Sequence, residues 1–191
     1  LRAESVLDPL LVELVGSLAE RTGPMTTLRT AVSAAAAVDP DHEQSPEANL
    51  RMAYRLMAKT PQIIATYQRL RTGADAVEPR DDLGIAANFL YALTGKEPDA
   101  QVARDFDVVL VLYADHTLNA STFAARVAAA TLADMYAATT AAVATLQGPL
   151  HGGAIEEVRE MLEEIGTPDQ APGWVRDRLA AKQKIMGFGH R

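Results

Sequence analysis

Apolar residues recur at helical spacing along most of this 191-residue chain, and no segment alternates apolar and polar residues as a half-buried strand would. Alanine is frequent in these segments. It combines the highest helix propensity with a side chain small enough for helix backbones to approach closely. The length is sufficient for one domain with a substantial core, or for part of a larger one. The sequence therefore predicts an all-α fold in which residues 1–191 form one helical domain.

Proline, glycine and capping residues divide this pattern into predicted helices. We expect helices at residues 6–19, 25–38, 45–71, 81–93, 97–114, 121–146, 154–165 and 172–181. Thr22 and Ser45 are the expected caps of the second and third helices, and Pro61 predicts a kink or a restart capped by Thr60. Residues 108–113 have the composition of a strand, but they continue a helical pattern without turn signals and predict a buried helix.

Composition limits the classes of function. The net charge of −7 and the absence of any Lys/Arg run argue against a nucleic-acid-binding surface. No cysteine is present, which excludes disulfides and thiolate chemistry, and we expect no metal site. The N-terminus lacks a signal-peptide pattern, and residues 127–146 include Asp134 and several threonines, which favours a buried helix over a membrane span. We therefore expect a cytoplasmic protein.

Polar residues interrupt the apolar pattern at residues 115–122, which contain Asp115, His116, Asn119 and several hydroxyl side chains. Polar groups between two buried helices need hydrogen-bond partners or a ligand. One interpretation is a binding loop that uses His116. The other is a capped helix junction, in which Asn119 or Ser121 caps the next helix and His116 bonds to backbone.

Two further stretches each place one histidine among glycines. His151 precedes Gly152-Gly153, and His190 follows Gly187-Phe188-Gly189. Glycine neighbours let backbone and ligand approach closely, so the two histidines suggest two walls of one pocket. His151 is also expected at a helix N-terminus, which favours a neutral imidazole that can donate a hydrogen bond to a developing enolate oxygen. Neither stretch has the spacing of a phosphate-binding loop or a dinucleotide fingerprint.

These stretches resemble the citrate synthase family, especially its bacterial and archaeal form. The similarity is carried by residues 115–126, the His-Gly-Gly-Ala motif at His151 and the Gly-Phe-Gly-His-Arg motif at His190, in the family's order and spacing. Residues 23–33 also resemble a helix of the family that begins after a Pro-Met pair. The resemblance covers nearly the whole chain. It implies the helical large domain, with the family's N-terminal segment and most of its small domain outside residues 1–191.

The family condenses acetyl-CoA with oxaloacetate to citrate in the tricarboxylic acid cycle, and it hydrolyses the intermediate citryl-CoA. By resemblance, His151 stabilises the enol of the thioester, and His190 binds and protonates the oxaloacetate carbonyl. His116 and Arg191 are expected to bind oxaloacetate. The loop expected to lie against coenzyme A contains Lys184, Ile185, Met186, Gly187, Phe188 and Gly189. The coenzyme A thioester is then a co-substrate, and no cofactor is permanently bound.

The resemblance leaves alternatives open. 2-Methylcitrate synthases, which use propionyl-CoA, share these motifs. The family's catalytic aspartate and its oxaloacetate-clamping arginines follow the second histidine, so we expect residues 1–191 alone to be inactive. Ile155 replaces the family's usual asparagine and Thr117 a common acidic residue, which keeps a non-catalytic, dimerising helical paralogue as an alternative. The broad apolar faces of residues 25–38 and 45–71 predict a homodimer.

Overall fold

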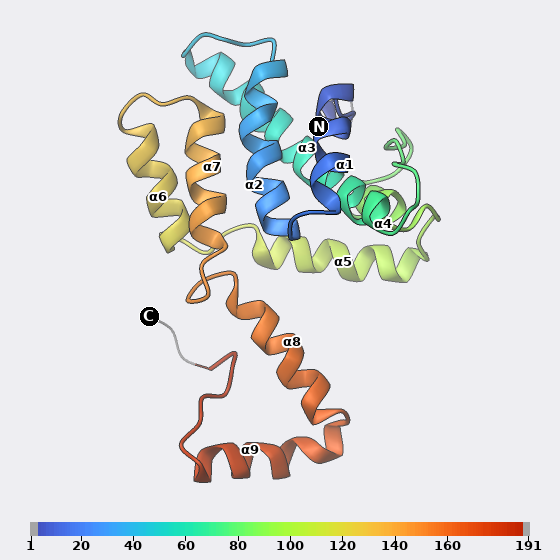
Figure 1. Cartoon of the computed structure of the whole chain (residues 1–191), viewed down its shortest axis with the longest axis vertical. Helices are drawn as coiled ribbons and strands as arrows, with labels where there is room; N and C mark the ends of the chain where they lie inside the picture. The colour runs from blue at the N-terminus through green and yellow to red at the C-terminus, as the bar shows by residue number, and fades with distance from the viewer. Residues whose placement is uncertain (1–3, 189–191) are drawn as a thin grey trace. The chain divides into compact units, whose positions relative to one another are not determined.

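The computed structural model describes residues 4–188, apart from the side chain of Glu156. Every regular element in this part of the chain is helical, which confirms the predicted all-α class (Figure 1). The elements are α1 (Pro9–Ala19), α2 (Pro24–Ala35), η2 (Ala36–Val38), α3 (Pro46–Arg71), α4 (Ile85–Thr94), α5 (Ala100–Tyr113), α6 (Ala120–Ala129), α7 (Met135–Leu146), α8 (Ala154–Ile165), η3 (Pro168–Gln170) and α9 (Ala171–Ala180). The chain divides into two compact units, Leu1–Thr145 and Leu146–Arg191.

The first two helices begin at prolines, which corrects two predictions. α1 begins at Pro9 rather than at residue 6, because the Asp8 carboxylate accepts the Leu10 N–H at 2.9 Å and caps the helix there. α2 begins at Pro24, directly after a glycine, so Thr22 is not its cap. A proline at the first helical position supplies the right backbone angle and lacks an N–H that would be unpaired in any case.

α3 is capped by Ser45, as predicted, and continues past Pro61 as one helix. The helix does not restart at Pro61, so that part of the prediction is wrong. Thr60 caps nothing, because its hydroxyl donates to the Leu56 carbonyl oxygen at 2.7 Å. Proline removes one backbone donor, but the side chains before and after it, including the buried Ile63, pack into the same core and hold the helix together.

α4 and α5 begin later than predicted because side chains fix the residues before them. The Asn88 side chain accepts the Arg80 N–H at 2.9 Å and donates to the Arg80 carbonyl oxygen at 2.7 Å, which holds the segment before α4 as a loop. The Asp99 carboxylate accepts the Gln101 N–H at 2.7 Å and caps α5. α4 ends at Thr94, and Gly95 just beyond it adopts the left-handed conformation, as the sequence predicts.

The predicted single helix at residues 121–146 is wrong, because a turn at residues 130–134 divides it into α6 and α7. Leu132 has a φ of 63°, which a right-handed helix does not accommodate. The Asp134 carboxylate accepts the Ala137 N–H at 2.8 Å and starts α7. The turn contains no glycine or proline, so Asp134 was its only sequence signal.

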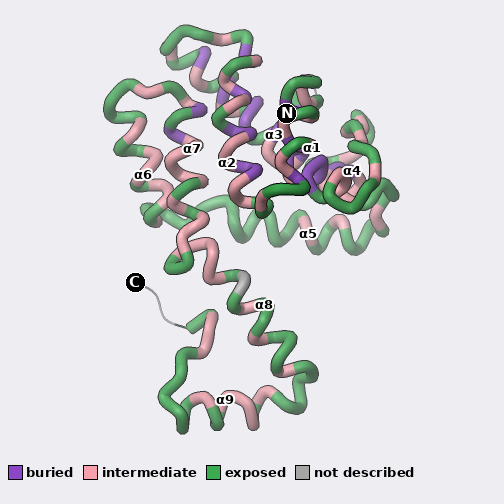
Figure 2. The backbone as a smooth tube through the Cα atoms, viewed as in Figure 1, coloured by how far each residue is buried: buried purple, intermediate pink, exposed green. Residues whose placement is uncertain are grey.

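The core of the first unit lies where α1, α2 and α3 face one another, and α7 contributes Tyr136 to it. Figure 2 shows buried residues along these helices. The core cluster consists of Leu11, Val15, Ala19, Leu28, Ala31, Val32, Ala35, Ala48, Met52, Leu56, Ile63, Tyr67 and Tyr136. Burying one large aliphatic side chain contributes roughly 1.5–3 kcal/mol, so this cluster rather than helix propensity stabilises the unit.

A buried charge network lies beside this core. The Asp39 carboxylate, 3% exposed, accepts Arg55 Nε at 2.6 Å and Arg55 Nη2 at 2.7 Å, and it also accepts the Tyr136 hydroxyl. The Asp41 N–H donates to it at 2.8 Å. Burial alone would raise the pKa of Asp39, but the hydrogen bonds from Arg55, Tyr136 and Asp41 outweigh it and lower the pKa below 3.8. The carboxylate is therefore charged, and both of its oxygens accept hydrogen bonds.

Residues 108–113 are helical, as predicted, but they are not buried within the described chain. All of them are exposed, and Tyr113 is 74% exposed. The physical reason is that α5 packs on α4 earlier in its length, where Phe89 stacks on Phe106 with 5.3 Å between ring centroids. Among the helices of residues 4–188, none is long and apolar enough to cross a membrane.

The Asp39 network predicts a stability that decreases in acid. The pKa of Asp39 is lower in the folded chain than its ordinary value of 3.8, so the unfolded chain binds a proton first as pH falls. The contribution of Asp39 to the free energy of unfolding should be complete above about pH 5 and be lost as pH falls through its folded-state pKa. Urea unfolding followed by far-UV circular dichroism should show this slope, and Asp39→Asn should reduce it.

Asp75→Asn is the matched control, because Asp75 is exposed in the same unit. At neutral pH, Asp39→Asn should lower the free energy of unfolding by about 3 kcal/mol, since it leaves the Arg55 guanidinium buried without its main counter-ion. Asp75→Asn should change it by less than about 0.5 kcal/mol. The same acid slope in both variants would contradict the role given to Asp39.

Candidate active site

His151 lies in a tight turn between α7 and α8. Its N–H donates to the Gly148 carbonyl oxygen at 2.9 Å, and the Gly153 N–H donates to the same oxygen at 3.2 Å. The His151 carbonyl oxygen accepts the N–H of Ala154, the first residue of α8, at 3.0 Å. These bonds fix the His151 backbone directly before a helix N-terminus, as the sequence predicts, and its side chain is partly buried.

The two glycines after His151 are required by close packing. A Cβ at Gly152 would lie 2.6 Å from Leu146 Cδ1 and 2.7 Å from the Leu146 carbonyl oxygen. A Cβ at Gly153 would lie 2.9 Å from the carbonyl oxygens of Gln147 and Gly148. All of these distances are shorter than van der Waals contact. The turn therefore folds back onto the end of α7 in a way that only glycine permits.

His116 lies in the exposed loop between α5 and α6. The next residue, Thr117, has a φ of 53°, which is uncommon for a residue other than glycine, and its N–H donates to Asp115 Oδ1 at 2.7 Å. Asn119 caps α6 by accepting the Thr122 N–H at 2.9 Å. The capped junction is thus confirmed for Asn119. The binding role of His116 stays a prediction.

The loop predicted to lie against coenzyme A follows α9. Lys184 and Phe188 are exposed, Phe188 by 83%, while Ile185 and Met186 are partly buried. Gly187 has a φ of 89°, in the left-handed region where glycine is favoured. The loop therefore presents an ammonium group and an aromatic ring to solvent on either side of a glycine turn.

Three predicted site residues, Gly189, His190 and Arg191, lie outside the described residues. Of the others, His116 belongs to the first unit, whereas His151 and residues 184–188 belong to the second. Their assembly into one pocket therefore stays a prediction.

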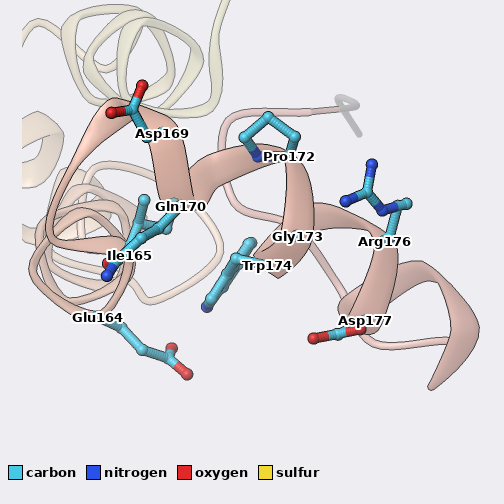
Figure 3. A pocket seen from close by; sticks show the side chains of 9 residues that line it. All are labelled: Glu164, Ile165, Asp169, Gln170, Pro172, Gly173, Trp174, Arg176 and Asp177. Carbon is cyan, nitrogen blue, oxygen red and sulfur yellow. The ribbon is translucent and has the colours of Figure 1, made fainter.

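A pocket of about 420 Å³ lies within the second unit and contains none of the predicted site residues. Figure 3 shows Trp174 of α9 in this pocket, with Glu164, Asp169 and Asp177 around it. Arg178 lies over the Trp174 ring at 4.7 Å from its centroid and pairs with Glu164 at 2.5 Å. Three carboxylates and one guanidinium, that of Arg176, line this pocket, and the resulting excess of negative charge disfavours an anionic substrate. The histidine loops therefore remain the better candidate.

Sequence reasoning did not find the network of Asp39, Arg55 and Tyr136. The available signal was the place of Arg55 on α3, three residues after the buried Met52 and directly before the buried Leu56. A charged residue in a core-facing row of a helix needs a buried partner. Within residues 4–188, no three His, Asp or Glu side chains are placed to hold a metal ion.

Comparison with known proteins shows the family. The profile of the family described as "Citrate synthase, C-terminal domain" matches residues 1–191. Citrate synthase 2 of Bacillus subtilis (strain 168) is 52% identical over 173 residues, which are 90% of this chain and 46% of that protein. A 2-methylcitrate synthase of Mycobacterium tuberculosis is 45% identical over 190 residues, which are 100% of this chain and 48% of that protein. The chain spans about half the length of the curated relatives it matches.

Solved structures show the same relationship. Citrate synthase from Pyrobaculum aerophilum matches with a TM-score of 0.86 and 43% identity, over 100% of this chain and 50% of that one. Citrate synthase from Thermoplasma acidophilum, solved as a ternary complex with carboxymethyl coenzyme A and oxaloacetate, matches with a TM-score of 0.88 and 29% identity, over 99% of this chain and 50% of that one. The chain belongs to the citrate synthase family.

Proposed function

We propose that the protein containing this chain condenses acetyl-CoA with oxaloacetate to give citrate and coenzyme A. The observation that carries the proposal is the His151 turn, whose backbone is fixed before the N-terminus of α8 in a chain of this family. The complex of the Thermoplasma acidophilum enzyme with carboxymethyl coenzyme A and oxaloacetate supports these substrates.

The proposed chemistry begins with loss of a proton from the methyl carbon of the thioester. The electron pair moves onto the carbonyl oxygen, and the His151 imidazole donates a hydrogen bond to this developing oxyanion. By resemblance, the base that takes the proton belongs to the part of the protein outside residues 1–191. We therefore propose that these residues alone are inactive.

The enol carbon then attacks the ketone carbon of oxaloacetate, and the ketone oxygen takes a proton from His190. Water hydrolyses the resulting citryl-CoA thioester, which releases citrate and the free thiol of coenzyme A. Against a net charge of −7, anionic substrates need local cations. In this proposal Arg191 and His116 bind oxaloacetate, and Lys184 in the loop of residues 184–189 binds coenzyme A. No permanently bound cofactor is needed.

A second candidate is the condensation of propionyl-CoA with oxaloacetate. It is favoured by the 2-methylcitrate synthase of Mycobacterium tuberculosis, which is 45% identical to this chain over its whole length. A third candidate is a non-catalytic paralogue, favoured by Ile155 at the second position of α8. Assaying the full-length protein with acetyl-CoA and propionyl-CoA separates the three. A higher kcat/KM with acetyl-CoA supports the first candidate, a higher kcat/KM with propionyl-CoA supports the second, and no turnover with either thioester supports the third.

We also propose a homodimer that forms through α2 and α3, in a cytoplasmic protein. α3 exposes Leu50, Tyr54 and Met57, each by more than 40%, and their spacing of four and three residues places them on one stripe. An exposed apolar stripe of this kind is suited to an isologous interface, in which the same surface of two copies meets itself.

Substitution of His151 tests the proposed function. His151→Ala in the full-length protein should lower kcat by roughly 10²–10³-fold with little change in oxaloacetate affinity, because the hydrogen bond strengthens only as the enolate forms. Steady-state kinetics with acetyl-CoA measures this. His42→Ala is the control, because His42 is exposed in the loop before α3. Equal, small effects at both positions would refute the role of His151.

Substitution of Gly152 tests the turn itself. Gly152→Ala places a methyl group 2.6 Å from Leu146 Cδ1 and 2.7 Å from a backbone oxygen, so the turn must shift. We expect the variant to lose about 1–3 kcal/mol of stability and most of its turnover. Gly173→Ala is the matched control. It lies inside α9 with no atom within 4 Å of the added carbon, and it should be neutral or slightly stabilising. Urea unfolding measures the stability of both variants and steady-state kinetics their kcat. Equal values for Gly152→Ala and Gly173→Ala would show that the turn tolerates a side chain.

Substitution of Met57 tests the dimer. Met57→Asp should convert the full-length protein from dimer to monomer at micromolar concentration, because it places a charge in an apolar interface. Leu10→Asp on α1, where the side chain is 50% exposed, should leave the dimer intact. Light scattering measures the mass, and a wild-type monomer would contradict the proposal.

A further inference from the structure

The α6–α7 hairpin is connected to two candidate site loops. α6 begins four residues after His116, and α7 ends five residues before His151. Figure 1 shows the two helices running in opposite directions, so the start of α6 and the end of α7 are at the same end of the hairpin. We call this the open end, and the turn at residues 130–134 the closed end. The closed end is therefore connected through α6 to the loop that contains His116.

The closed end of the hairpin is attached to the scaffold of α1, α2 and α3. Tyr136, in the first turn of α7, is 2% exposed, and its ring belongs to the core cluster. Its hydroxyl donates to the Asp39 carboxylate, which follows η2. At the turn itself, Gln44 Nε2 donates to the Leu132 carbonyl oxygen at 2.5 Å. The buried phenol and this second bond define the position of the closed end.

The acceptor of the Tyr136 bond is itself held rigidly. Two nitrogens of the Arg55 guanidinium bind the two oxygens of Asp39, at 2.6 and 2.7 Å, so the carboxylate cannot rotate without losing a charged hydrogen bond. Arg55 lies on α3, in the middle of the core-forming helices. A buried hydrogen bond from Tyr136 to a fixed carboxylate therefore sets one distance between α7 and α3.

We propose that Asp39 and Tyr136 are positioning residues for the condensation reaction: their buried hydrogen bond sets the α6–α7 hairpin on the scaffold and thereby the placement of the His116 loop, all within the first unit. The inference rests on the proposed function, in which His116 binds oxaloacetate. Neither positioning residue touches substrate. Loss of the bond lets the hairpin shift at its closed end, and a displacement of about 1 Å at a reacting group is sufficient to reduce turnover by up to about 100-fold.

The test compares two identical chemical changes in the full-length protein. Tyr136→Phe removes only the buried hydroxyl and keeps the ring in the core. Tyr91→Phe is the matched control, because Tyr91 lies on α4 in the same unit and its ring, not its hydroxyl, makes the contact with Arg80. Gln44→Ala removes the second attachment of the closed end and should show a smaller effect in the same direction.

Steady-state kinetics is the first readout, at a temperature where all variants are folded. Tyr136→Phe should lower kcat by about tenfold and raise KM for oxaloacetate by about threefold to tenfold, while KM for the thioester changes by less than about twofold, since residues 184–188 are not on the hairpin. Tyr91→Phe should keep all three constants within about twofold of wild type. A merely structural role would lower stability and leave the constants of the folded enzyme unchanged.

Hydrogen exchange measured by mass spectrometry is the second readout, and it does not depend on activity. Tyr136→Phe should speed exchange of α6 and α7 amides by about tenfold and leave α1–α4 amides unchanged. Uniform exchange across all helices, or kinetics equal to those of Tyr91→Phe, would overturn the proposal. Absence of condensation activity in the wild-type protein would refute the proposed function. In that case, hydrogen exchange would still decide whether the bond holds the hairpin.

Discussion

The Asp39 carboxylate is the charge on which the arrangement of the first unit depends. It lies between η2 and α3 in sequence, and its partners Arg55 and Tyr136 come from α3 and α7, 16 and 97 residues away. An ionised carboxylate buried without donors would be strongly destabilising, whereas here the guanidinium, the phenol and a backbone N–H surround it. Burial and the hydrogen bond to Asp39 both raise the pKa of Tyr136, so the phenol remains a donor. The network therefore specifies one relative position of α3 and α7, which apolar packing alone would define less strictly.

The turn at His151 is also fixed by specific contacts, in this case between residues close in sequence. The Gly148 carbonyl oxygen accepts two N–H groups, and Gly152 packs directly on Leu146, so the backbone of the turn has little freedom. Preorganised donors stabilise developing charge without reorganisation during the reaction, which is the property an enol-stabilising histidine needs. This local geometry, rather than any cavity, supports the assignment of His151. The acidic pocket around Trp174 has the wrong charge for a carboxylate substrate.

Helical periodicity and capping residues were sufficient to predict most elements, including the α3 cap at Ser45 and the left-handed Gly95 just after α4. The errors have physical causes. The turn at Leu132 uses a left-handed leucine, which no local sequence preference indicates. α3 passes Pro61 because tertiary packing outweighs one lost hydrogen bond. Residues 108–113 are apolar on every side and yet exposed in the described chain, so apolar composition predicted their helix but not their surroundings.

The candidate site was predictable only in part. Glycine neighbours and polar interruptions located the loops of His116 and His151, because both features are local in sequence. Their chemical roles came from resemblance to the family. The network of Asp39 and Tyr136 was not predictable, because a pairing across 97 residues leaves no trace in periodicity or spacing. Arg55 in a core-facing row was a sign that a partner existed, but it did not identify the partner.

A crystal structure of the full-length protein with oxaloacetate and carboxymethyl coenzyme A, a thioether analogue of acetyl-CoA, tests the central claim most directly. The carboxylate of this analogue stands in for the enolate of the acetyl group. The account predicts an imidazole nitrogen of His151 within about 3 Å of that carboxylate, with oxaloacetate in contact with His116. An analogue bound away from the His151 turn, or a His151 imidazole beyond hydrogen-bond reach of it, would contradict the account.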